Sequence, residues 1–306
     1  MADDPNWPRA TAWLAGDHHP QPVARIAVIG APVRLGSISG GRFDLAPAAI
    51  REALRGFSTY DGDRDVRAVA AKDAGDLELA ERKPEDALTE IAGAVGGTLD
   101  TFDAVVVLGG DNSITRPAVR GLGPDLGRVG LLTLDAHHDL RDTGSGLSNG
   151  NPVRALLEDG LPGRNVVQVG IQRFANSASY AQVASDAGIT VVTTDDTRTR
   201  GVVSVMDEAL VHLDRVAEAI YVDLDLDVLD RAFAPACPGS RPGGLWPHEL
   251  QAAARIAGAH PKVRGVDLVE VDPQRDVADV TVTGAASCLL SFASGLASRH
   301  RVGPSG

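Results

Sequence analysis

Short apolar runs recur along the chain, and most of them end in glycine or in acidic residues. The clearest runs occupy residues 24–30, 103–109, 131–134, 165–170, 189–193, 219–224 and 263–269. Strands that are apolar throughout are typical of a parallel sheet that is covered on both faces. Between the runs, the pattern predicts helices that begin near residue 46 and span residues 86–99, 177–187, 201–218 and 281–298. This alternation of strands and helices predicts an α/β fold with a mostly parallel central sheet.

Two stretches interrupt this order. Residues 1–22 are rich in Pro, Asp and His and show no helical or strand period, which predicts an irregular N-terminal arm. The charged residues 58–85 predict a short excursion and a linker before the next helix. Because no other stretch resembles a linker between domains, we expect residues 23–306 to form a single domain.

Polar side chains gather where four of the predicted strands end. They are Asp111 and Asn112, residues 135–139, residues 223–227, and Glu270. The carboxyl ends of parallel strands meet at one edge of a sheet, where ligands bind in such folds. Strand alternation would place Asp135, His137 and Asp139 on one face. Taken alone, that stretch could also be an acidic helix cap, but the convergence of four strand ends favours a metal site.

The residue types at these ends indicate a reaction class. Crowded carboxylates repel one another, and divalent cations would neutralise the repulsion and use the oxygens as ligands. Oxygen-rich ligation with few histidines favours Mn²⁺ over Zn²⁺. A pair of such metals lowers the pKa of a shared water and holds it against an electrophilic carbon. The residues alone therefore indicate a metal-dependent hydrolase.

The composition limits the kinds of molecule that this protein binds and the cellular compartment in which we expect it. The formal net charge of −12 argues against nucleic acid or an anionic membrane as the main partner. Only Cys237 and Cys288 are present, so no disulfide framework is indicated. The N-terminus lacks a secretory pattern, and the apolar runs are shorter than the roughly 20 residues that span a bilayer. We therefore expect a soluble cytoplasmic protein that acts on a small molecule.

Four motifs carry a resemblance to a known family. Gly109-Gly-Asp-Asn-Ser113, Asp135-Ala-His-His-Asp139, Asp225-Leu-Asp-Val-Leu-Asp230 and Glu270-Val-Asp-Pro273 resemble the ordered motifs of the arginase and agmatinase superfamily of ureohydrolases. The resemblance runs from about residue 24 to residue 297. It implies a three-layer α/β/α fold, a binuclear Mn²⁺ site, and a homo-oligomer that is usually a trimer or a hexamer.

Within that superfamily the chain resembles the formimidoylglutamases of histidine degradation, which convert N-formimidoyl-L-glutamate and water into L-glutamate and formamide. The narrower cues are Arg141, the stretches 148–154 and 169–176, and Ala234-Pro-Ala-Cys-Pro238 followed by Pro242-Gly-Gly244. Arginases and agmatinases typically carry a proton-transferring His where this chain has Asn149. Two alternatives stay open: a guanidino hydrolase that releases urea, such as an agmatinase or a guanidinobutyrase, and a metal-poor binding homologue without catalysis.

The resemblance also implies roles for single residues. One metal would be held by Asn112, Asp135, Asp139 and Asp225, and the other by Asp135, His137, Asp225 and Asp227. Most of the superfamily has His at the position of Asn112, so this metal is expected to be held more weakly. A hydroxide bridging the metals would attack the formimidoyl carbon. Asp139 would deliver a proton to the leaving amine, and Glu270 would align the imino nitrogen. The candidates for binding the substrate's carboxylates are Arg141, Asn149, Arg154 and Arg173.

Overall fold

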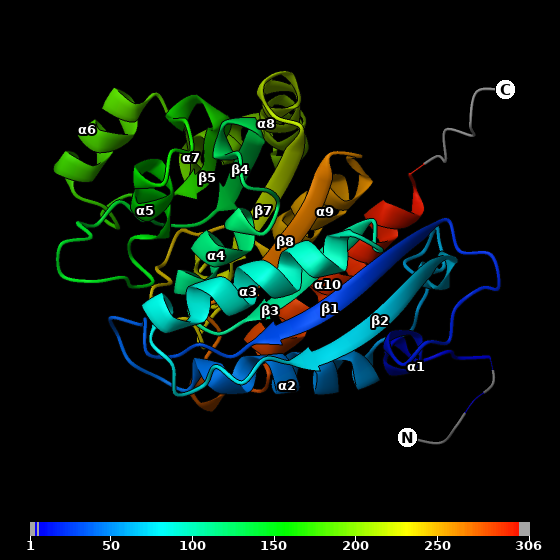
Figure 1. The fold of residues 1–306 in the computed structure, drawn as a ribbon. Coiled ribbons are helices and arrows are strands. Elements are labelled where there is room, and N and C mark those ends of the chain that lie inside the picture. The colour runs from blue at the N-terminus through cyan, green and yellow to red at the C-terminus, as the bar shows by residue number, and fades with distance from the viewer. Residues whose placement is uncertain (1–3, 5, 300–306) are drawn as a thin grey trace, which may run out of the picture.

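The computed structural model describes residue 4 and residues 6–299, and its centre is one sheet of parallel strands (Figure 1). The strands lie in the order β2-β1-β3-β8-β7-β4-β5-β6. Every strand pair that the sheet contains is parallel. The strand bounds are β1 Ala24–Ala31, β2 Val69–Asp76, β3 Ala104–Gly109, β4 Val129–Leu134, β5 Val166–Ile171, β6 Thr190–Thr193, β7 Ala219–Asp225 and β8 Val263–Val269.

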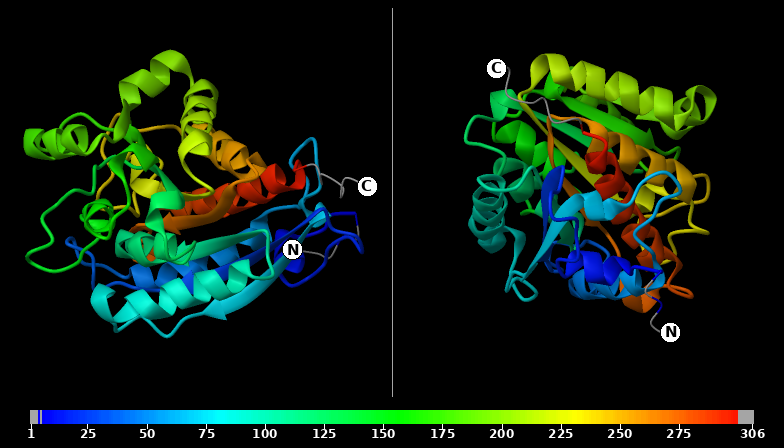
Figure 2. Two further views of the ribbon diagram at one scale, coloured as in Figure 1. Left: turned by 45° about the horizontal axis from the view of Figure 1, so that its top comes forward. Right: turned by 90° about the vertical axis from the view of Figure 1, so that its right-hand side faces the viewer.

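Helices cover both faces of this sheet, as the two views of Figure 2 show. One apolar cluster joins the sheet to α1, α2, α8, α9 and α10, and the other joins the opposite face to α3, α4, α5 and α6. The predicted three-layer α/β/α fold is therefore confirmed. The helix bounds are α1 Ala10–Leu14, α2 Ala46–Ala53, α3 Pro84–Leu99, α4 Thr115–Arg120, α5 Pro152–Glu158, α6 Ala178–Ala187, α7 Thr194–Arg200, α8 Val202–Val216, α9 Pro247–Ala259 and α10 Val280–Ala297.

The middle of the sheet positions the polar strand ends. Strands β3, β8, β7 and β4 are consecutive neighbours, and β3 and β4 are buried along their whole length. Because all four run in the same direction, the residues that follow them leave the sheet at one edge. Segments that are up to about 160 residues apart in the chain are thereby brought to one place.

Two expectations about regular structure were wrong. Residues 69–76, which were expected to lie in a linker, form the edge strand β2 and pair with β1. Its second half is exposed and contains Lys72 and Asp73, so the sequence shows no continuous apolar run there. Residues 10–14 of the predicted irregular arm form the short helix α1, in which buried Trp13 donates a hydrogen bond to the carbonyl of Val69 at 2.9 Å. Five residues are too few for a visible helical period.

Helix α10 is the one described helix that is long and apolar enough to cross a membrane by length and composition. However, 61% of this stretch is buried inside the protein. Its side chains belong to the same apolar cluster as α2, α9 and the sheet. Core helices of globular proteins pass the same test, and the packing identifies α10 as one of them.

Candidate metal centre

The predicted metal ligands converge at the shared edge of the four central strands. Asn112 follows β3, the stretch 135–139 follows β4, Asp225 ends β7, and Asp227 lies in the turn directly after it. Glu270 follows β8 in the same way. The side chains of this set, apart from His137, are at most 7% exposed. Buried carboxylates at this density require a positive partner, because each one loses its hydration.

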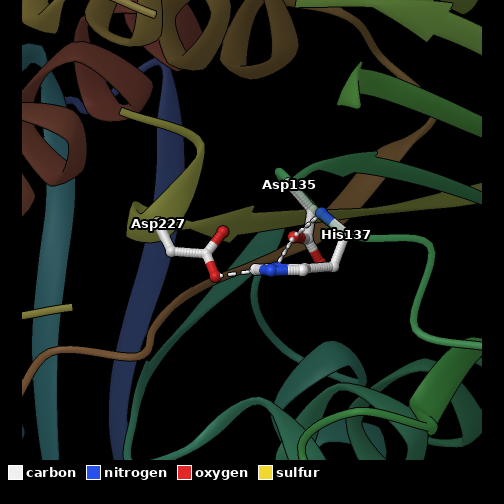
Figure 3. A group of neighbouring side chains, drawn as sticks. All are labelled: Asp135, His137 and Asp227. Carbon is white, nitrogen blue, oxygen red and sulfur yellow. Dashed lines mark hydrogen bonds and ion pairs between the residues drawn. The ribbon is translucent and has the colours of Figure 1, made fainter. Parts of the chain in front are cut away.

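On one side of the cluster an imidazole lies between two carboxylates (Figure 3). His137 Nδ1 is 2.9 Å from Asp227 Oδ2 and 3.4 Å from Asp135 Oδ1. Asp135 and Asp227 lie just after β4 and β7, which are neighbours in the sheet. One ligand atom from each of the three residues lies within 4.8 Å of the others, which is the geometry of a metal-binding group. We call these three residues the His137 side.

The backbone of the His137 side is fixed by two tight turns. Asp135 Oδ1 accepts a hydrogen bond from the amide of His137 at 2.6 Å, and Asp225 Oδ1 accepts one from the amide of Asp227 at 2.8 Å. An aspartate that caps the backbone two residues onward forms an Asx turn. Each strand therefore ends in a turn that aims two side chains at the same point.

The charges on the His137 side shift its pKa values strongly. Asp227, together with hydrogen bonds to both carboxylates, raises the pKa of His137 to about 12 against the opposing effect of burial. Burial, helped by the nearby Asp227, raises the pKa of Asp135 to about 6. Burial also raises the pKa of Asp225, and Asp227 adds to the rise. In the metal-free protein the imidazolium therefore supplies the positive charge that the carboxylates require.

The other side of the cluster, which we call the Asn112 side, is built from an amide and a carboxylate. Asn112 Nδ2 donates to Asp139 Oδ2 at 2.6 Å, and its Oδ1 accepts from Thr115 Oγ1 at 2.6 Å. Burial, with the charge of Asp135, raises the pKa of Asp139 well above its ordinary value. The Asn112 amide is thus held at both ends by hydrogen bonds, and neither Asn112 nor Asp139 brings a positive charge to this side.

Glu270 lies beside the cluster and is held by its neighbours. Its Oε1 accepts hydrogen bonds from the amide of Asn112 at 2.8 Å and from Asn149 Nδ2 at 3.0 Å. The Oδ1 atom of Asn149 is occupied by the amide of Ile38 at 3.1 Å. Burial and the charge of Asp111 raise the pKa of Glu270 to about 8. Within the described chain no hydrogen bond occupies Oε2, so this oxygen is free to meet a ligand.

Backbone strain marks the two predicted catalytic residues. Asp139 has φ of 53° and Glu270 has φ of 65°, both in the left-handed region. Residues other than glycine rarely adopt this conformation, and such strain is concentrated at functional sites. The surrounding fold imposes it here: the amide of Glu270 donates to the carbonyl of Gly110 on the neighbouring strand end, at 3.1 Å. The strain indicates that the positions of the two carboxylates matter more than local backbone energy.

A cavity of 160 Å³ opens over the cluster. Its wall includes Asp139, Asp225, Asp227 and Glu270, together with Arg141 and Asn149 from the predicted substrate set. Larger cavities of 420 and 740 Å³ lie elsewhere, against α9, and contain none of the predicted metal ligands. We therefore assign the smaller cavity, which holds the chemistry, as the candidate active site.

Two of the predicted substrate residues lie outside this cavity. Arg154 is bound to Glu158 on the same helix, at 2.9 Å. Arg173 forms an ion pair with Asp195 and lines a separate hollow next to exposed Phe174. Both guanidinium groups are already neutralised by a carboxylate of the protein. The position of neither residue supports a substrate contact, and we remove both from the proposed site.

The structure also reveals site residues that the sequence reading did not assign. Asn176 Oδ1 accepts a hydrogen bond from the amide of His138 at 2.8 Å, and its Nδ2 donates to the carbonyl of Ala136 at 2.9 Å. These two bonds fix the backbone of the stretch 135–139. Asp111 Oδ2 accepts from the amide of Gly36 at 2.9 Å and so ties the glycine-rich loop to β3. Arg241 lies on the cavity wall. The sequence indicates Asp111 at a strand end and includes Asn176 in the stretch 169–176, but it could not predict their contacts, because the partners are distant in sequence.

Comparisons with known proteins assign the chain to a family. The model of the arginase family matches residues 24–294. The chain belongs to the arginase family. A formimidoylglutamase of Halalkalibacterium halodurans is 37% identical over 88% of this chain and 86% of its own length.

Solved structures of other arginase-family proteins have the same fold. The crystal structure of formimidoylglutamase from Bacillus subtilis superposes with a TM-score of 0.90 at 31% identity, covering 98% of this chain and 95% of the other. The crystal structure of Trypanosoma cruzi formiminoglutamase with two Mn²⁺ superposes with a TM-score of 0.87 at 25% identity, covering 96% and 100%. Such relatives explain why the family motifs converge at one edge of this sheet.

The residues present suit Mn²⁺. The donors are mostly carboxylate oxygens with one imidazole, a set that a hard divalent cation favours. Gly239 backs the His137 side so closely that a Cβ there would collide with Asp227 Oδ2 and lie 3.1 Å from His137 Cε1. Space beside the ligand atoms is thus kept free of side chains. A divalent ion would replace the proton of His137 and also neutralise the carboxylates.

Proposed function

We propose that this arginase-family protein is a formimidoylglutamase, which hydrolyses N-formimidoyl-L-glutamate to L-glutamate and formamide. The observation that carries the proposal is the division of charge in one cavity. Buried carboxylates form its floor, and the exposed Arg141, whose guanidinium group has no carboxylate partner among the described residues, lies at its rim. The formimidoyl group is a cation and the glutamate part is an anion, so the two ends of this substrate match the two ends of the cavity.

The ligand set proposed for two Mn²⁺ per subunit follows the two sides of the cluster. Asp135 and Asp225 would be shared, His137 and Asp227 would complete one site, and Asp139 with Asn112 would complete the other. When bound, the ions would lower the pKa of a water molecule that they share. Because Asn112 offers a neutral amide that already donates to Asp139, we propose weaker binding on this side.

The protein's own side chains then orient the substrate and move one proton. Glu270 Oε2 accepts a hydrogen bond from the cationic imino nitrogen and presents the formimidoyl carbon to attack, while Asn149 and the amide of Asn112 hold Oε1. Water adds to that carbon, and the bond from it to the glutamate nitrogen breaks. Asp139 takes up the proton that the attacking water loses and passes it to the leaving amine.

A guanidino hydrolase is the second candidate, because the carboxylate floor would accept a guanidinium group equally well. Agmatine carries a cationic amine on its tail, which the guanidinium of Arg141 would repel. Guanidinobutyrate, whose tail is a carboxylate, fits the rim better than agmatine does. The remaining alternative is a homologue that binds metal poorly and has no catalysis.

One assay separates the three candidates. Protein reconstituted with Mn²⁺ is supplied with N-formimidoyl-L-glutamate, agmatine or 4-guanidinobutyrate, and formamide, glutamate and urea are measured. Formamide and glutamate without urea support the proposal. Urea from either guanidine would instead assign a guanidino hydrolase, and no turnover on any substrate after verified metal loading would leave the non-catalytic reading.

The cellular location, the assembly and the domain division of the protein are also proposals. We propose a cytoplasmic enzyme that assembles into homotrimers or homohexamers and whose residues 23–306 form one catalytic domain behind an N-terminal arm of residues 1–22. Cell fractionation tests the location, and light scattering after size-exclusion chromatography tests the assembly. Deletion of residues 1–22 tests the domain division, although buried Trp13 leads us to expect some loss of stability.

A further inference from the structure

The cavity over the metal centre contains a second guanidinium group that the proposed function does not yet use. Its floor is anionic, because Asp139, Asp225, Asp227 and Glu270 all line it. Among the described residues, Arg141 and Arg241 are the two arginines on its wall. Both are exposed, and they come from loops about a hundred residues apart that follow β4 and β7.

Neither of these arginines has a carboxylate partner within residues 6–299. By contrast, Arg154 and Arg173, their counterparts just outside the cavity, are each paired with an acidic residue. Arg241 Nη1 donates only to carbonyls of its own loop, to Gly239 at 2.8 Å and to Ser240 at 3.4 Å. Two unneutralised guanidinium groups above an acidic floor leave capacity for two anionic groups of a ligand.

The loop that carries Arg241 is rigid and is joined to the metal centre. Arg231 Nη1 donates to the carbonyl of Cys237 at 2.8 Å, and the amide of Arg231 donates to the carbonyl of Arg241 at 3.1 Å. Gly239, which accepts the hydrogen bond of Arg241, packs directly against Asp227 and His137. The guanidinium of Arg241 is therefore held at a fixed place relative to the reacting end of the cavity.

Arg141, on the loop after β4, is also positioned by a backbone hydrogen bond and by close contact with a glycine. Its amide donates to the carbonyl of Gly150 at 3.0 Å. Its side chain crosses Gly150 so closely that a Cβ there would lie 2.6 Å from Arg141 Cδ. Glycine at position 150 thus lets the guanidinium reach the cavity, two residues beyond the proposed proton donor Asp139.

We propose that Arg241 is a second substrate-binding residue and that Arg141 and Arg241 together select an amidine whose tail carries two carboxylates. Each guanidinium binds one carboxylate through paired N–H donors, a geometry that a single ammonium group cannot provide. Such a pair rejects cationic tails and favours a dicarboxylate over a monocarboxylate. The inference rests on the proposed function and adds Arg241 to the residues that select its substrate.

The test compares two substrates that differ by one charge. Mn²⁺-loaded wild-type protein and the variants R141Q and R241Q are assayed on N-formimidoyl-L-glutamate and on N-formimidoyl-L-glutamine, which lacks the side-chain carboxylate. The matched control is R215Q, which removes the same charge from an exposed arginine on α8, away from the cavity. R241K is added because it keeps the charge and loses the paired donors.

We expect R241Q to raise KM for N-formimidoyl-L-glutamate about 10- to 100-fold, the effect of losing one charge-assisted pair, with little change in kcat. One of the two variants should also lose the preference for the glutamate over the glutamine derivative, because it has lost the partner of the side-chain carboxylate. R241K should recover only part of the affinity, and R215Q should match the wild type.

An unchanged KM in R241Q, with the wild type active, would overturn the inference while the proposed function stands. A fall in kcat with unchanged KM would also overturn it, since a purely structural role predicts that pattern. If the wild type turns over neither formimidoyl substrate, the proposed function itself fails. Because Arg241 is exposed, its substitution should leave the melting temperature unchanged, which is checked in the same samples.

Discussion

The two sides of the carboxylate cluster differ in what lies next to their buried carboxylates. On the His137 side an imidazolium lies between Asp135 and Asp227 and supplies a positive charge. On the Asn112 side a neutral amide donates to Asp139, whose pKa is raised well above its ordinary value by burial and by the charge of Asp135. The proposed ligand sets differ in one place: the His137 side offers an imidazole, once it has lost its proton, where the Asn112 side offers a weaker, neutral amide. We therefore propose that Mn²⁺ binds the His137 side first and more tightly.

The largest effect should come from a carboxylate that serves both sides. D225N should lose both metals together and lower kcat/KM by about 10³-fold or more, the scale of removing a cooperating catalytic unit. Elemental analysis and turnover measure this. The matched control is D223N, which changes a buried aspartate on the same strand that is not in the proposed ligand set. Loss of only one metal in D225N would contradict the proposed sharing.

Substitution on the His137 side should come next in size. H137N should lose the tighter metal, because Asp135 and Asp227 then lack their nitrogen partner, and kcat should fall about 100- to 1,000-fold. Titration with Mn²⁺ by isothermal calorimetry should show that the high-affinity phase has gone. If the low-affinity phase disappeared instead, the assignment of the two sides would have to be reversed.

Substitution on the Asn112 side should produce a gain. N112H replaces the neutral amide by an imidazole, a stronger ligand, and should tighten the weaker metal about 10- to 100-fold. Competition with a chelator of known affinity measures the change. N112D, which restores a charge without an imidazole, is the companion variant. Equal affinity of both metals in the wild type would remove the basis of this comparison.

The smallest effect concerns the metal-free protein. Asp135 and Glu270 have raised pKa values of about 6 and about 8, and that of His137 is raised to about 12. Folded protein therefore binds more protons than unfolded protein between pH 5 and 8, so stability falls as the pH rises through that window. Asp227, whose pKa is lowered, titrates below this range.

Thermal unfolding in chelator at pH 5, 6, 7 and 8 should accordingly show a falling melting temperature. Added Mn²⁺ should reverse the trend, because the metal requires deprotonated ligands. E270Q should reduce the slope between pH 6 and 8, because it removes the carboxyl group whose pKa is raised to about 8. A melting temperature that rises with pH in chelator would show that the carboxylates are already charged in the metal-free fold.

The apolar pattern predicted most of the fold because the central strands are buried on both faces. Strand β3 has no polar residue from Ala104 to Gly109, and no other element accommodates such a short apolar run. The edge strand β2 was not predicted, because much of it is exposed and its sequence is not apolar throughout. Only one of its sides pairs with a neighbour, so residues such as Lys72 and Asp73 are tolerated, and nothing in their order differs from a charged loop.

The metal cluster was predictable in its members but not in its hydrogen bonds. Asp135, Asp225 and Glu270 follow apolar strands, and the parallel fold alone requires their ends to meet. That Asn112 donates to Asp139, or that both predicted catalytic residues have positive φ, depends on atomic contacts between strands. Such contacts depend on distances of fractions of an ångström and produce no pattern in the sequence.

The sequence by itself determined the layered fold, the strand ends that carry the carboxylates, and the family to which the chain belongs. Each of these follows from local patterns: burial along a strand, and motifs of adjacent residues. Only the tertiary structure decided which arginines are available to a ligand. Arg154 and Arg173 are paired with Glu158 and Asp195, whereas Arg241 on the cavity wall has no carboxylate partner in the described part of the chain. The reason is physical: a guanidinium group has the same character everywhere in a sequence, and its function depends on which carboxylates the fold brings within reach.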